Sequence, residues 1–165
     1  MNEARYLELL ARCERKLFCV AKAYLRNASD CEDAYSQAIL KGWNRRFSLI
    51  HEERFQVWMA KILVRECLNI CKKQRREQEK LKRYQQKQQT ECSEYKTNTV
   101  VEMVYELPEA QRVPIILFYS DGYSLNEIAD ILGISNALVK SRMHEGRKKL
   151  RIKLEGMGYD SPDKE

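Results

Sequence analysis

The 165-residue sequence has few of the residues that build loop-rich or β-rich proteins, with only three prolines and six glycines. It contains no run of about 18 apolar residues, so no membrane-spanning helix is predicted. Its first residues lead into an interrupted amphipathic pattern and not into the apolar core of a signal peptide, which predicts a cytoplasmic protein. Hydrophobic residues still make up 44% of the chain, so a packed core is expected.

Side chains for catalysis or metal binding are also scarce. There are only two histidines, His51 and His144. No glycine-rich phosphate loop, Ser/His/Asp set or pair of carboxylates can be placed in one site. We therefore expect no enzymatic activity, no cofactor, no bound metal and no small-molecule substrate.

The cysteines show no C-x-x-C spacing, although Cys67 and Cys71 lie four residues apart on a predicted helix. A metal site there would need two further ligands, so small buried side chains in a reducing compartment are the favoured interpretation. The six cysteines are Cys13, Cys19, Cys31, Cys67, Cys71 and Cys92.

Positive charge is concentrated in two segments, although the net charge of the chain is only +6. Residues 61–87 hold ten Lys or Arg and three Glu, and residues 140–153 hold seven Lys or Arg and one Glu. A single basic stretch is ordinarily a solvated helix face. Two such stretches in an otherwise acidic chain indicate two contacts with a polyanion.

Apolar residues recur at helical spacing and no strand pattern is present, so the sequence predicts an all-α protein. Helices are predicted at 4–25, from about Asp30 to Arg46, and from about Arg54 to beyond Cys71. The second would begin at a capping box formed by Ser29 and Glu32. The predicted apolar sets are Tyr6, Leu7, Leu10, Leu17, Phe18, Ala21, Tyr24 and Leu25, then Ala34, Ile39, Leu40 and Trp43, then Phe55, Trp58, Ile62 and Leu68.

The pattern divides the chain into two small helical domains, 1–76 and 99–155, with a tail at 156–165. Residues 77–98 are rich in Lys, Arg, Gln and Glu and poor in apolar residues, which is typical of a flexible basic linker. In the second domain Pro108 marks a helix start, Pro114 is expected to kink or shorten that helix, and Gly122 lies in the next turn.

Residues 124–150 have the pattern of a helix-turn-helix. Ser124 and Glu127 form a capping box, and Gly133 stands where a left-handed residue ends the first helix. Small Ala129 lies where the second helix would cross, and Val139 follows ten residues later. An ordinary helical hairpin, the alternative, needs neither the small residue nor the glycine at those positions. The second helix is capped by Ser135 and is expected to turn Leu138, Val139, Met143 and Leu150 inward.

The outward face of that second helix carries hydrogen-bond donors and cations suited to the major groove. For any one of them a solvated surface residue is an equal alternative. The expected base contacts are Asn136, Lys140, Ser141 and His144, and the expected phosphate contacts are Arg142, Arg147, Lys148 and Lys149.

These motifs resemble the two-domain, extracytoplasmic-function (ECF) type of bacterial σ factor. The resemblance runs from about Tyr6 to Leu154. Segments 107–109, 121–129, 132–135 and 139–144 resemble region 4 of the family, and Asp30 to Asp33 followed by Gln37 resembles region 2.2. Segment 55–59, F-Q-V-W-M, resembles the start of the next family helix.

The resemblance implies a polymerase subunit that selects promoters. Asp33 and Gln37 would contact the clamp helices of the polymerase β′ subunit, and region 4 would sit on the β flap and read the −35 element. The loop from Phe47 and Ser48 to Glu53 would hold a flipped base of the −10 element. The basic helix beside it would follow the DNA backbone through Lys61, Arg65, Lys72 and Lys73.

Other interpretations stay open for parts of this scheme. Trp43, Phe55 and Trp58 suit strand melting, but aromatic residues at helical spacing are more often core. Glu145 stands where many family members carry a basic residue, which predicts an unusual −35 preference. The chain as a whole would alternatively be a stand-alone helix-turn-helix regulator acting as a dimer, or an enzyme with a DNA-binding tail. A σ factor of this type would also imply an anti-σ partner.

Overall fold

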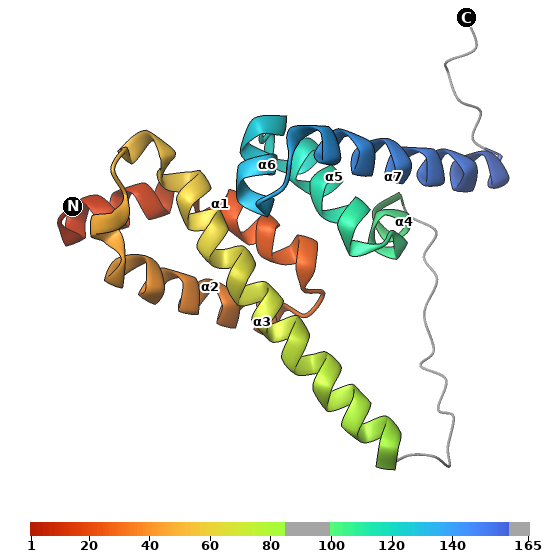
Figure 1. Cartoon of the computed structure of the whole chain (residues 1–165), viewed down its shortest axis with the longest axis horizontal. Coiled ribbons are helices and arrows are strands. Elements are labelled where there is room, and N and C mark those ends of the chain that lie inside the picture. The colour runs from red at the N-terminus through yellow and green to blue at the C-terminus, as the bar shows by residue number, and fades with distance from the viewer. Residues whose placement is uncertain (85–99, 159–165) are drawn as a thin grey trace, which may run out of the picture. The chain divides into compact units, whose positions relative to one another are not determined.

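The computed structural model describes residues 1–84 and 100–158, and within these ranges it contains helices and no strands. The chain divides into two compact units, Met1–Tyr95 and Lys96–Glu165. Figure 1 shows the helices of both units. None of the described helices combines the length and apolar character that a membrane span requires. The all-α prediction is confirmed.

The first unit is built on α1 (Glu3–Tyr24), α2 (Ala28–Asn44) and α3 (Phe55–Tyr84), which pack against one another. Two short 3-10 turns, η1 (Arg46–Ser48) and η2 (Glu52–Arg54), connect α2 to α3. The helix α3 continues eight residues past the predicted domain boundary at residue 76. Of the predicted linker, residues 77–84 belong to α3 and residues 85–98 lie outside the described residues.

The start of α2 differs from the prediction. Asn27 is the N-cap, and its side chain accepts a hydrogen bond of 2.8 Å from the backbone of Ser29. The expected capping box of Ser29 and Glu32 is therefore wrong, because Ser29 already lies inside the first turn. Two cap-forming residues stand close together here, and the asparagine, which is among the strongest N-caps, occupies the position.

The core of the first unit contains fully buried side chains from α1 and α3, among them Leu17, Val20, Met59 and Leu63. Two residues assigned to the apolar sets do not belong to it, since Leu7 is 52% exposed and Leu40 is 58% exposed. Helical periodicity alone does not show where the edge of the buried stripe falls, and both residues lie outside that edge.

Tyr6 connects all three long helices of this unit. Its hydroxyl donates a hydrogen bond of 2.8 Å to the carbonyl of Ile39 in α2. Its ring meets Trp43 and Phe55 edge to face, with centroids 5.3 and 5.5 Å apart. A Cβ added to Gly42 would lie 2.5 Å from the Tyr6 hydroxyl, so glycine is what permits this close approach.

Polar contacts join α2 to α3. Lys41 Nζ lies 2.6 Å from a carboxylate oxygen of Glu66, a mostly buried side chain. At the other end of α2, Gln74 donates a hydrogen bond of 2.8 Å to Asp30. The mostly buried Glu66 carboxylate is thus paired with a cation, as the burial of a charge requires.

The second unit contains α4 (Val100–Glu106), α5 (Glu109–Asp121), α6 (Leu125–Leu132) and α7 (Asn136–Gly156). Pro108 caps the start of α5, close to the predicted position. Of the two effects predicted for Pro114, the shortening of the helix is wrong, because α5 continues seven residues beyond it. A kink at Pro114 stays a prediction. Pro114 is fully buried, and the packing around it outweighs the backbone hydrogen bond that it cannot make.

Candidate nucleic-acid interface

The turn between α6 and α7 is set by local caps. The Ser124 and Glu127 capping box is present with both reciprocal hydrogen bonds. Gly133 ends α6 in the left-handed region, with φ of 65°, and the Ser135 side chain accepts from the backbone of Leu138 to start α7. Val139 is fully buried, as the offset from Ala129 predicted. The predicted helix-turn-helix geometry is confirmed.

The inward face of α7 differs from the prediction at two positions. Val139 and Met143 are buried, but Leu138 is 40% exposed and Leu150 is half-buried. In their place the buried stripe includes Gly146. A Cβ there would lie 2.5 Å from Ile115 Cδ1 and 3.3 Å from Gln111 Cβ, so α7 crosses α5 closely at this glycine.

Most of the side chains predicted to face DNA lie on the opposite side of α7. Ser141, His144 and Lys148 follow one another at spacings of three and four residues, which places them on one face of the helix. They are exposed, as are Lys140, Arg147 and Lys149, whereas Asn136 and Arg142 are half-buried.

Asn136 is engaged within the protein. Its side-chain amide donates to the Asn126 side chain of α6, and its Oδ1 atom is buried without a hydrogen-bond partner. The residue therefore links the two helices of the motif at the point where the second begins. Sequence reasoning treated Asn136 as a free base-reading side chain and did not anticipate this link.

A basic hollow of about 480 Å³ lies along the middle turns of α7. Four side chains from successive turns line it, His144, Arg147, Lys148 and Arg151. Arg147 Nη1 also lies 3.4 Å from the hydroxyl of Tyr119 in α5, an exposed side chain. The concentration of positive charge in a surface depression is suited to a phosphate group.

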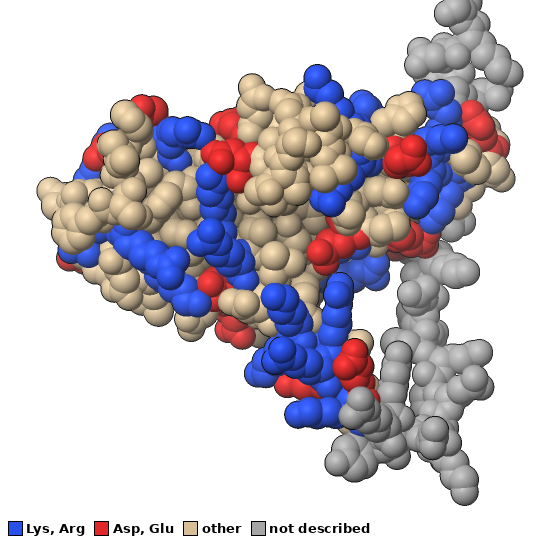
Figure 2. All heavy atoms as spheres, in the orientation of Figure 1, with Lys and Arg blue, Asp and Glu red and all other residues tan. Residues whose placement is uncertain are grey.

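The basic part of α3 forms a second cationic surface. Lys61, Arg65 and Lys72 lie four and seven residues apart, which places them on one stripe of the helix, and Lys73 follows beside it. Arg65, Lys72 and Lys73 are exposed, and Lys61 is half-buried. Figure 2 shows Lys and Arg side chains gathered on the C-terminal part of α3 and, separately, near the end of α7.

The segment between α2 and α3 exposes apolar side chains. Phe47 is 75% exposed and Ile50 is 86% exposed. Ser48 is also exposed, and its hydroxyl donates a hydrogen bond of 2.8 Å to the Arg45 carbonyl. The Arg46 guanidinium lies between the rings of Trp43 and Phe47. The segment between α2 and α3 thus combines exposed apolar side chains with a backbone held by a local hydrogen bond.

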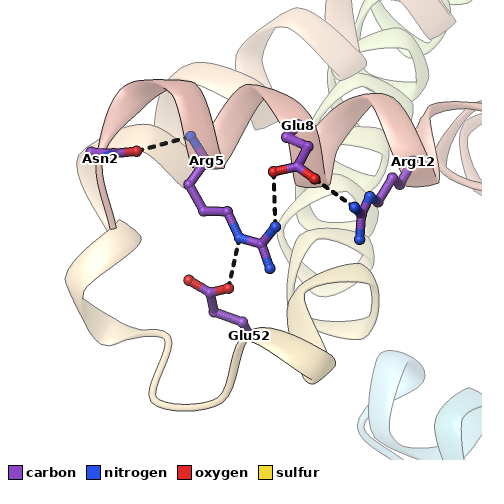
Figure 3. Close-up of polar contacts among 5 residues, drawn as sticks. All are labelled: Asn2, Arg5, Glu8, Arg12 and Glu52. Carbon is purple, nitrogen blue, oxygen red and sulfur yellow. Dashed lines mark hydrogen bonds and ion pairs between the residues drawn. The ribbon is translucent and has the colours of Figure 1, made fainter.

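The far end of the same segment is held by α1. Arg5 donates to the carboxylates of Glu52 in η2 and Glu8 in α1, both at 2.8 Å, and Glu8 also contacts Arg12 (Figure 3). The hydrogen bond from Arg5 and the charge of Arg12 hold the pKa of Glu8 below its ordinary value. These groups are exposed, so water and salt screen the interactions.

On α2, Asp33 and Gln37 are both exposed and lie four residues apart on one face. Leu40, three residues further, extends this face with a large exposed apolar side chain. A protein-binding surface of mixed polar and apolar character is consistent with this combination.

The described cysteines are buried or half-buried side chains. No group of three or more candidate ligands is arranged around a common point in the described parts of the chain. Burial raises the pKa of Cys13 to about 11 and raises that of Cys67 further, so both thiols stay protonated. Cys13, Cys31 and Cys67 are buried, Cys19 and Cys71 are half-buried, and Cys92 lies outside the described residues.

Comparison with known proteins assigns both units. The family model of Sigma-70 region 2 matches residues 9–77, and the model of Sigma-70, region 4 matches residues 98–150. The RNA polymerase sigma factor SigV of Bacillus subtilis (strain 168) is 27% identical over 154 residues, covering 88% of this chain and 91% of SigV. The ECF RNA polymerase sigma factor SigW of the same organism is 26% identical over 155 residues, covering 84% of this chain and 83% of SigW.

Two solved structures share the fold. The sigma factor RpoE from Bartonella quintana, in complex with the anti-sigma factor NepR, matches with a TM-score of 0.75 at 22% identity, over 95% of this chain and 99% of that chain. CnrH, in complex with the cytosolic domain of CnrY, matches with a TM-score of 0.69 at 22% identity, over 94% of this chain and 90% of that chain. With regions 2 and 4 matched in order along its length, the chain belongs to the ECF group of the sigma-70 family of RNA polymerase sigma factors.

Proposed function

We propose that this sigma factor binds core RNA polymerase and directs it to promoters whose −35 element is read by α7 and whose −10 element is bound by the first unit. The observation that carries the proposal is the occurrence of two separate basic surfaces, on α3 and on α7, in units that match regions 2 and 4. Each surface alone would support nonspecific DNA binding. Together they suit two elements of one promoter.

For the polymerase contact, the proposal assigns Asp33 and Gln37 to the β′ clamp helices, with Leu40 as an apolar addition. The support is their common exposed face on α2. The second unit would sit on the β flap. We take 1–76 and 99–155 as the functional domains, joined through 77–98.

For the −10 element, Phe47 and Ser48 would meet an unpaired base, because both are exposed at the tip between α2 and α3. Extruding a base from the duplex costs a few kcal/mol, and contacts to the extruded base offset that cost. The stripe of Lys61, Arg65 and Lys72, with Lys73 beside it, would follow the adjacent phosphates.

For the −35 element, Lys140, Ser141 and His144 would reach base edges from the leading part of α7. Arg142, Arg147 and Lys148 would contact phosphates, and the hollow beside His144 is the natural place for one of them. Asn136 would act by fixing the start of α7 against α6, and direct base contact would require its contact with Asn126 to open.

Glu145 would modify what the helix reads. It is exposed on the same side of α7 as Ser141 and His144. A carboxylate there repels phosphate and accepts a hydrogen bond from the amino group of cytosine. We therefore propose a −35 preference that differs from the family's commonest motif and that Glu145→Arg would change.

A sigma factor provides promoter recognition, and the polymerase provides the catalysis, so we propose no active site in this chain. A polymerase subunit acts beside the chromosome, in the cytoplasm. Since the two structural neighbours carry an anti-sigma factor, NepR, and the cytosolic domain of CnrY, we also propose a protein inhibitor for this chain. It would compete with the polymerase for the exposed faces.

The experiment that tests the proposal compares promoter binding by the free chain and by its complex with core polymerase. The promoter is obtained by selection from a randomised duplex library with the reconstituted complex. We expect tight binding only in the complex and weak binding by the free chain. Tight binding of the free chain as a dimer to a palindrome would instead establish the stand-alone regulator.

A further inference from the structure

Arg46 is held between two aromatic rings at the start of the exposed segment. Its guanidinium carbon lies 3.9 Å from the centre of the Trp43 ring and 4.2 Å from the centre of the Phe47 ring. Both distances fall within the range of attractive cation–π contacts, which are stronger where the cation is withdrawn from water. The three side chains therefore form a stack in the order Trp43, Arg46, Phe47.

The polar atoms of Arg46 are directed at the protein. Nη1 donates a hydrogen bond of 2.9 Å to the carbonyl of Trp43, one of the last carbonyls of α2. The negative end of that helix also favours a cation at this place. Nε is buried and has no hydrogen-bond partner. The guanidinium is thus fixed where it stands and is poorly placed to reach out to a phosphate.

The stack is anchored in the core at one end and open at the other. Trp43 meets Tyr6 edge to face at 5.3 Å, and Tyr6 is 1% exposed. Phe47 is 75% exposed, although a ring of its size is ordinarily buried. Its restrained ring is therefore presented to solvent by a continuous series of contacts that begins inside the first unit.

We propose that Arg46 is a positioning residue that holds the Phe47 ring as a preformed stacking surface for an unpaired base of the promoter. The inference rests on the proposed function, and it adds a residue that contacts no DNA itself. A base is stabilised on an aromatic ring regardless of its identity, because every base has a π face. Fixing the ring in advance removes the entropy cost of ordering it when the base arrives.

The test uses holoenzyme reconstituted from the full chain, on a promoter selected by the wild-type complex from a randomised library. The measured quantity is the lifetime of the open complex for Arg46→Ala, Phe47→Ala and the double variant. We expect each single substitution to shorten the lifetime about tenfold. The double variant should match Phe47→Ala alone, because Arg46 acts through that ring.

Two further variants separate stacking from charge. Arg46→Lys keeps the charge but lacks the planar face, so most of the loss should remain. Arg45→Ala removes a neighbouring exposed charge and is the matched control, with a lifetime near that of wild type. The salt dependence of promoter binding should be the same for Arg46→Ala and wild type, whereas a lost phosphate contact reduces its slope by about one.

Several outcomes would overturn the inference. They are additive losses in the double variant, a wild-type lifetime for Arg46→Lys, or a reduced salt slope for Arg46→Ala. Thermal unfolding and core-polymerase binding of each variant confirm that the fold is retained. Failure of the wild-type complex to initiate from any promoter would refute the proposed function itself and is thereby distinguished from failure of this inference.

Discussion

Replacing Gly146 by alanine tests the close crossing of α7 over α5. The new methyl group would lie 2.5 Å from Ile115 Cδ1 and 3.3 Å from Gln111 Cβ. Overpacking of this kind costs about 1–3 kcal/mol. The better helix propensity of alanine returns up to about 1 kcal/mol. Set against each other, these two effects predict a net loss of up to about 2 kcal/mol in the stability of the second unit, together with a displaced recognition helix.

The assay combines thermal unfolding of the full chain with amide hydrogen exchange in α5 and α7, because the two units need not unfold together. Gly156→Ala is the matched control, since its Cβ would meet nothing within 4 Å. Ile115→Val removes the clashing atom. Alone it costs about 0.5–1.5 kcal/mol, and combined with Gly146→Ala it should restore stability.

The reasoning would be refuted if Gly146→Ala behaved like Gly156→Ala. In that case a Cβ would fit at the crossing, and α7 would not be held by contact with Ile115. A second expectation concerns DNA, since a displaced α7 should weaken −35 binding by the holoenzyme while leaving core-polymerase binding intact.

Three further predictions concern the first unit. Lys41→Ala leaves the Glu66 carboxylate, which is 11% exposed, without its cation. The free energy of unfolding, measured with denaturant, should fall by about 1–2 kcal/mol, less than for a fully buried pair because Lys41 is 41% exposed. Replacing both Lys41 and Glu66 by methionine should recover the loss. Burial raises the pKa of Cys13 from 9.0 to about 11. The buried, protonated thiol therefore contributes its full stability to the fold below about pH 9, and that contribution is lost as the pH rises through about 11. The unfolding midpoint of Cys13→Ala should therefore fall less steeply over that range, and an equal slope would contradict the burial argument. Arg5→Ala should speed amide exchange around Glu52 without a large change in the global midpoint, and unchanged exchange would show that the contact restrains nothing.

The helix-turn-helix was predictable because its determinants are local. A capping box at Ser124, a left-handed glycine at 133 and a second cap at Ser135 each act within a few residues. These signals leave few alternatives for the chain between them. The buried position of Val139 followed from the same spacing.

Other features depended on contacts between distant segments. Nothing in the spacing of residues shows that Gly146 must admit Ile115, which lies 31 residues earlier. Likewise Leu40 fits the helical pattern of α2 but lies beyond the region that α1 and α3 cover. Periodicity identifies a face, and the width of the buried part is decided by what packs against it.

The stack at Arg46 is an intermediate case. Its members, Trp43, Arg46 and Phe47, are close in sequence, and an arginine flanked by aromatic residues at the end of a helix is a readable signal. The sequence did not show that the guanidinium would turn inward to the Trp43 carbonyl. Nor did it show that Tyr6, from another helix, would contact the same indole ring.

The central claim is that one chain confers promoter selection on the polymerase. The most direct measurement maps RNA 5′ ends made by core polymerase, with and without the chain, on a library of random duplex DNA. The account predicts new transcription start sites that occur only with the chain and are preceded by two separate enriched sequence elements. The sequence of the upstream element should change when the chain carries Glu145→Arg. No chain-dependent start sites, or a single palindromic element bound by the free chain, would contradict it.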